Sequence, residues 1–118
     1  MSAEYYGPTV AAVERLNRLL DLPATGHEQD WEIEFADPAK LGDMLRVLRT
    51  ENLDEEEQCA LSALALHSLE EAAGAGIKVN LAAAELRGTL AQTPALQDKM
   101  RFYWSRLSPE GAVAFVLG

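Results

Sequence analysis

The stretch 54-DEEEQCALSALALHSLEEAAGAG-76 decides the fold class of this chain. It opens with D-x-x-E, in which Asp54 can cap a helix while the side chain of Glu57 reaches back to the cap. The acidic first turn also suits the positive end of a helix dipole. From Cys59 to Leu69 nearly every residue is apolar or alanine, which covers more than one helical face, and 74-GAG-76 ends the pattern. We therefore predict a central, buried helix over about residues 54–73.

Apolar residues recur at helical spacing on both sides of this stretch, and prolines or cap residues mark where helices begin. The spacing predicts further helices over about residues 8–21, 38–50, 80–92 and 94–107. Residues 109–117 are expected to form a last short helix, although a terminal strand also fits the apolar run 112-AVAFVL-117. The predicted fold class is all-α, a compact bundle of five or six helices joined by short loops.

One segment breaks the helical pattern. In 30-DWEIEFAD-37, acidic and apolar residues alternate with a period of two, which is typical of an extended chain. We predict a short extended segment near residues 31–35 that lies across the bundle or pairs with another strand. In this interpretation Trp31, Ile33 and Phe35 turn inward, and Glu32 and Glu34 turn outward.

Length and charge restrict the classes of function. A chain of 118 residues fits a single helical domain, residues 1–118, with a core of its own. Hydrophobic residues make up 48% and charged residues 25%, which is ordinary for a soluble globular protein and indicates neither disorder nor a fibrous repeat. The formal charge of −9 disfavours binding to nucleic acid or to an anionic membrane and favours a basic protein partner.

Cysteine usage and the N-terminus indicate a cytoplasmic protein. Cys59 is the only cysteine, so the chain forms no internal disulfide and no multi-cysteine zinc site. The start MSAEYYGPTV lacks a basic segment followed by an apolar run, and no window approaches 18 uninterrupted apolar residues.

The sequence contains no recognisable catalytic motif. The two histidines, His27 and His67, belong to no metal-binding spacing, and Cys59 follows three glutamates that oppose a thiolate. The serines lie in no nucleophile elbow, and no glycine-rich phosphate loop occurs. We predict no catalytic residues, no cofactor and no metal, and a small enzyme without a recognisable motif remains an open alternative.

The segment 51-ENLDEEEQCALSALALHSLEEA-72, together with the acidic segment around Trp31 and with 103-YW-104, carries a resemblance over roughly residues 30–104. The matching positions are Trp31, Leu53, Asp54, Glu55, Glu57, Ala60, Leu61, Leu64 and Ser68. In these positions the chain resembles small acidic helical immunity proteins of bacterial polymorphic toxin systems. The resemblance implies a protein that inactivates a secreted toxin by binding it.

Charge and resemblance lead to one hypothesis and one alternative. The hypothesis is an acidic binder that occludes a basic toxin domain, with charge steering the encounter. Its predicted partner-binding residues are Asp30, Glu32, Glu34, Asp37, Asp54, Glu55 and Glu56. The alternative is a helical adaptor or oligomerisation subunit, since an exposed 112-AVAFVL-117 tail would extend the core of another molecule.

Overall fold

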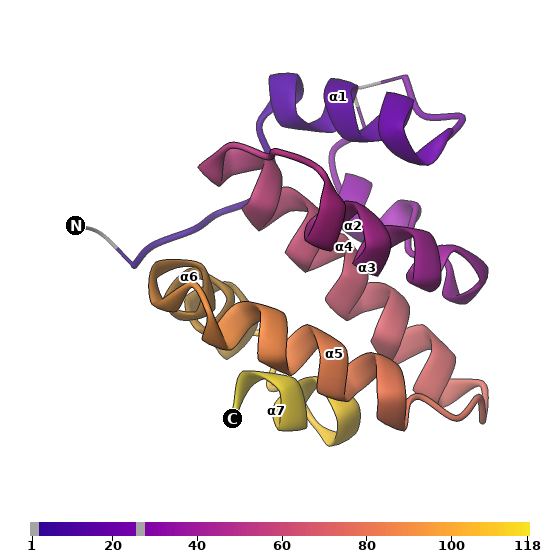
Figure 1. Ribbon diagram of the computed structural model, residues 1–118, viewed down its shortest axis with the longest axis vertical. Helices are drawn as coiled ribbons and strands as arrows, with labels where there is room; N and C mark the ends of the chain where they lie inside the picture. Colours follow the sequence, from indigo (N-terminus) through magenta and orange to yellow (C-terminus); the bar gives the residue numbers. More distant parts are fainter. Residues whose placement is uncertain (1–2, 26–27) are drawn as a thin grey trace.

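A computed structural model describes residues 3–25 and 28–118, and Figure 1 shows these residues as helices packed around one long helix. The described ranges contain no strand, so the predicted all-α class is confirmed. In chain order their elements are α1 (Val10–Leu20), α2 (Trp31–Glu34), the 3-10 turn η1 (Pro38–Lys40), α3 (Leu41–Thr50), α4 (Glu55–Gly74), α5 (Asn80–Ala91), α6 (Pro94–Ser105) and α7 (Gly111–Leu117).

The helix α4 is the centre of the core, as the sequence predicts. It contacts α1, α2, α3, α6 and α7, and its residues from Cys59 to Leu69 are all buried. In Figure 1 it crosses the middle of the molecule, with α1 above it and α5 and α7 below it. The nearly uninterrupted apolar run is needed because neighbouring helices cover α4 on several sides.

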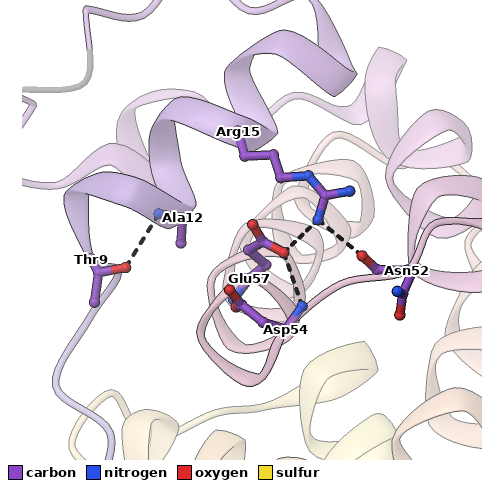
Figure 2. Close-up of polar contacts among 6 residues, drawn as sticks. All are labelled: Thr9, Ala12, Arg15, Asn52, Asp54 and Glu57. Atoms are coloured by element: carbon purple, nitrogen blue, oxygen red, sulfur yellow. Dashed lines mark hydrogen bonds and ion pairs between the residues drawn. The ribbon is translucent and has the colours of Figure 1, made fainter.

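The start of α4 is fixed by the predicted capping box and by an arginine from α1 (Figure 2). The backbone N–H of Glu57 donates to Oδ1 of Asp54 over 2.8 Å, and Oε1 of Glu57 accepts from the backbone N–H of Asp54 over 2.9 Å. Nη1 of Arg15 donates to the same Oε1 over 2.6 Å and to the backbone oxygen of Asn52 over 2.9 Å. The cap of one helix is thereby tied to another helix.

Three predicted helix starts differ in detail from the structure. The first helix begins at Val10 because the Thr9 side chain caps it, which leaves Pro8 before the cap. Asn80 is the first residue of α5, with Val79 at the cap position, and Thr93 makes no capping hydrogen bond with its side chain. At the C-terminus residues 111–117 are helical, so the strand alternative is wrong.

The prediction of an extended segment near residues 31–35 is also wrong, because Trp31–Glu34 forms one turn of helix. The backbone N–H of Glu34 donates to the oxygen of Asp30 over 2.7 Å, and that of Phe35 donates to the oxygen of Trp31 over 3.0 Å. A helical turn satisfies these groups within the segment, whereas a lone extended chain would need a second strand. Because the segment is helical, the side chains that it buries differ from those that the alternating sequence pattern predicts.

Trp31 anchors this turn in the core. Its side chain is 1% exposed, and Nε1 donates to Oδ1 of Asn17 in α1 over 2.8 Å. Behind the turn, the backbone N–H of Asp37 donates to the Ser68 hydroxyl on α4 over 2.9 Å. Segment 31–37 is thus held to both α1 and α4.

No helix within the described ranges combines the length and the apolar character that a membrane crossing requires.

Candidate partner-binding site

A pocket of about 220 Å³ opens between α2, the end of α6 and the N-terminal segment. We name it the tyrosine pocket, and its lining consists of Tyr5, Tyr6, Asp30, Glu32, Ile33, Tyr103, Arg106 and Leu107. It brings together residues from three distant parts of the sequence, including two of the predicted partner-binding acids.

Aromatic contacts hold the N-terminal segment against α6 and so form one wall of the pocket. The ring centroids of Tyr5 and Tyr103 lie 5.8 Å apart, and the rings of Tyr6 and Phe102 form a T-shaped pair with centroids 5.3 Å apart. The guanidinium of Arg106 lies over the Tyr6 ring, 5.4 Å from its centroid. Figure 1 shows the N-terminal segment passing beside α6 before it reaches α1.

A hydrogen-bonded chain of three side chains runs from the core to the pocket. The Tyr103 hydroxyl donates to Oε2 of Glu32 over 2.7 Å, and Nε2 of His67 lies 2.9 Å from the Tyr103 oxygen. Burial, and then the hydrogen bond to Glu32, raise the pKa of Tyr103 well above its ordinary value, so the phenol keeps its proton. Since that proton goes to Glu32, Nε2 of His67 carries the hydrogen and donates to Tyr103.

His67 is held neutral at the inner end of this chain. It is 8% exposed, and its ring lies 4.4 Å from that of Trp104 between centroids. Burial lowers the pKa of His67 to about 4. A neutral imidazole with its hydrogen on Nε2 fits the hydrogen bond to Tyr103 and positions the phenol toward Glu32.

Two polar atoms in the lining residues lack hydrogen-bond partners among the described residues. They are Oε1 of Glu32 and the hydroxyl of Tyr5, and both residues are 5% exposed. A buried polar atom without a partner is costly, and such atoms are rare in folded proteins. Two residues that line the tyrosine pocket therefore each carry a buried polar atom that the fold leaves without a partner.

The acids predicted in the segment 30–37 have unequal positions. Asp30 and Glu32 line the pocket, whereas Glu34 is exposed on the same turn and lies outside the lining. Asp37 is half-buried and caps η1 by accepting from the backbone N–H of Ala39 over 2.9 Å. The prediction that Glu32 faces outward and Ile33 inward is wrong: Glu32 is buried and Ile33 is 50% exposed. In a helical turn residues i and i+4, here 31 and 35, lie on one face, so the period of two does not apply.

The acids predicted at the start of α4 are exposed, and they serve different contacts. Asp54 is the helix cap, Glu55 forms an ion pair with Lys99, and Glu56 takes part in neither of these two contacts. Burial, and then the neighbouring acidic groups Cys59, Glu32 and Glu56, raise the pKa of the Tyr5 hydroxyl. Carboxylates from α2 and from α4 therefore lie close enough to act on the same tyrosine.

Cys59 is buried beneath this surface, as the sequence predicts. Burial raises the pKa of its thiol to about 11; Lys99 opposes the rise, and Glu56 and Glu55 add to it. A thiol with such a pKa stays protonated near neutral pH and is a poor nucleophile.

Residues 3–25 and 28–118 bring no three His, Cys, Asp or Glu side chains into a group suited to a metal ion. His27, one of the two histidines considered for a metal site, lies outside the described residues.

Sequence reasoning missed the aromatic half of the pocket and Arg106. The pair Tyr5 and Tyr6 precedes the first helix and belongs to no periodic pattern. The contact between Tyr103 and Glu32 joins residues 71 positions apart. Only the acidic character of the segment around Trp31 signalled this surface.

Comparison of the chain with models of known protein families, with curated proteins and with solved structures gives no match.

Proposed function

We propose that this chain is an immunity-type protein of the bacterial cytoplasm that binds a basic toxin domain and neutralises it by occlusion. The observation that carries the proposal is the tyrosine pocket, a concave surface to which Asp30 and Glu32 contribute two carboxylates. The first turn of α4, in which Glu55 and Glu56 are exposed, is a second acidic stretch on the surface. The proposal assigns no catalytic step to the chain.

Charge supports a basic partner over the other classes. The formal charge of −9 repels phosphate backbones and anionic lipid, and it accelerates encounter with a positively charged protein. Exposed acids at the rim act chiefly on the association rate, whereas buried groups at the centre act on the lifetime of the complex. Asp30 and Glu56 are exposed and have the rim role, and Glu32 has the central one.

Charge reversal at the rim tests this proposal. The partner is the basic domain encoded next to the gene of this chain, and the measurement is its association rate at several salt concentrations. The double variant Asp30→Lys and Glu56→Lys is expected to associate about tenfold more slowly and to lose most of the salt dependence.

A matched control uses the double variant Glu70→Lys and Glu71→Lys, which makes the same change of charge at the other, exposed end of α4. It is expected to associate at a rate closer to that of the unaltered chain. If both double variants associate equally slowly, the effect comes from net charge and not from this surface. If the partner does not bind the unaltered chain, the proposal is refuted.

A helical adaptor or oligomerisation subunit is the second candidate, and one groove favours it. The groove has a volume of about 470 Å³ and is lined by residues of α4, α5 and α7 and of the loop between α4 and α5. Phe115 in its lining is 47% exposed. The 112–117 tail nevertheless packs mostly into its own core, because Val113, Val116 and Leu117 are buried. Sedimentation at rising concentration tests this candidate, which predicts self-association that Phe115→Lys abolishes.

A further inference from the structure

We propose that the tyrosine pocket binds one primary ammonium group, of the kind that a lysine side chain presents. The inference rests on the proposed function in one respect only, namely that the basic partner supplies the lysine. The pocket chemistry itself is argued from the lining residues and is tested with a small amine.

The charge that a ligand of this pocket must carry follows from the charges of the lining residues. Asp30 and Glu32 contribute two carboxylates to the lining, and Arg106 contributes the single cation. The guanidinium of Arg106 lies over two rings, 5.4 Å from the centroid of Tyr6 and 5.7 Å from that of Phe102. Because these rings already engage Arg106, the excess negative charge of the lining favours a cationic guest.

The unpartnered atoms specify a hydrogen-bond donor. Oε1 of Glu32 can only accept a hydrogen bond when the carboxylate is ionised, and within the described residues nothing donates to it. The hydroxyl of Tyr5, equally buried and unpartnered, belongs to the same pocket lining and can act as a second acceptor. A ligand that donates to these two oxygens would satisfy the polar atoms that the fold leaves without partners.

The second carboxylate oxygen of Glu32 favours an ammonium group over a guanidinium group. Oε2 of Glu32 already accepts from the Tyr103 hydroxyl over 2.7 Å. A guanidinium recognises a carboxylate best through both oxygens at once, whereas an ammonium is a compact donor that needs only one. With one oxygen occupied, Glu32 is suited to the ammonium. A quaternary ammonium has no N–H to donate and would leave Oε1 unsatisfied.

The size of the pocket fits the head and stem of one side chain. Its volume of about 220 Å³ is below the range of about 300–1,000 Å³ that is usual for drug-sized ligands. The lining also contains the aromatic rings of Tyr5 and Tyr103, which can attract a cation, and Ile33 and Leu107, which offer apolar surface to a methylene stem. Charge, hydrogen bonding and size therefore agree on a lysine-like group.

A series of small ligands on the unaltered chain tests the inference. n-Butylammonium, n-butyltrimethylammonium and n-butanol are titrated separately at constant ionic strength, and the ring resonances of Tyr5 and Tyr103 are followed by NMR. n-Butylammonium is expected to shift both residues saturably and to bind about tenfold more tightly than its trimethylated analogue. n-Butanol is expected to cause no saturable shift, and equal binding by all three ligands, or no saturable shift with the amine, would overturn the inference.

Two conservative variants identify the acceptor. Glu32→Gln keeps the shape of the side chain but removes its charge, and it is expected to weaken n-butylammonium binding about tenfold or more. Glu34→Gln, on the same helical turn but outside the pocket lining, is the matched control and is expected to bind as the unaltered chain does. Unchanged binding by a folded Glu32→Gln protein would overturn the inference, and if this variant does not fold, the ligand series decides alone.

Failure of this inference and failure of the proposed function can be told apart. Saturable amine binding without any binding of the basic domain would leave the pocket assigned and the toxin-neutralising function refuted. Binding of the basic domain without amine binding would retain the function and remove the lysine pocket from its interface.

Discussion

Cys59 illustrates how burial and charge act together on a single side chain. The residue lies in the second turn of α4, is 0% exposed, and has its thiol pKa raised to about 11. We predict slow reaction with a thiol reagent in the folded protein and fast reaction in denaturant, because both accessibility and thiolate fraction rise on unfolding. Absorbance-monitored labelling measures both rates, and rapid labelling of the folded protein would contradict the prediction and make Cys59 a candidate nucleophile.

His67 makes the stability of the fold depend on pH. Burial lowers its pKa in the folded state from 6.5 to about 4, so below pH 6.5 the unfolded chain binds a proton that the folded chain does not. The free energy of unfolding is therefore expected to fall as the pH drops from 6.5 towards 4, by about 3 kcal/mol when the whole pKa difference is realised.

Urea unfolding across this pH range, with His67→Gln as the comparison, measures the contribution of His67. Glutamine can still donate a hydrogen bond to Tyr103 but does not titrate. Carboxylates also titrate near the acid end, so the quantity of interest is the difference between the two proteins. If both lose the same free energy on acidification, His67 is not the cause.

At the scale of elements, the tie between Arg15 of α1 and Glu57 of α4 holds two helices together (Figure 2). Glu57 is 7% exposed, so removing Arg15 would leave a buried carboxylate without its cation. We predict that Arg15→Ala lowers the free energy of unfolding by about 1–3 kcal/mol. Urea unfolding is the measurement, and Arg18→Ala, on the exposed side of the same helix, is the control. Equal effects of the two variants would show that the tie contributes nothing.

The central position of α4 leads to a second prediction about the packing of the helices. Leu64 is 0% exposed at the middle of the helix, and a charge there would lack any partner. Leu64→Asp is expected to unfold the protein, since a buried unpaired charge costs several kcal/mol and such proteins are stable by only about 5–15 kcal/mol. The same substitution at Leu81, which is 88% exposed, is expected to leave the circular dichroism spectrum helical. A folded Leu64→Asp protein would contradict the placement of α4.

The elements also show where sequence reasoning succeeds and where it does not. The start of α4 was predictable because Asp54 and Glu57 are local partners, three residues apart, and the apolar run after them has no alternative to burial. The turn Trp31–Glu34 was not, because one turn is too short to display a helical period. Alternation in such a short stretch is compatible with an extended segment and with a helical turn. The helical turn forms because it satisfies the backbone hydrogen bonds within the segment.

For the molecule as a whole, the acidic half of the candidate site was accessible from sequence and the aromatic half was not. Asp30 and Glu32 were named because of their charge, and both line the tyrosine pocket. Tyr5 and Tyr103 join them only through tertiary packing of the N-terminal segment against α6. A single sequence contains no signal for that contact, since the two tyrosines belong to no common motif.

The position of the binding surface can be measured over the whole molecule in one experiment. The isotope-labelled chain is titrated with the basic domain encoded by the neighbouring gene, and backbone and tyrosine ring shifts are followed by NMR. We predict saturable changes concentrated at Tyr5, Asp30, Glu32, Glu56 and Tyr103. Changes confined to the groove around Phe115 would favour the adaptor alternative, and no saturable change anywhere would contradict the proposal that this acidic surface binds the basic domain.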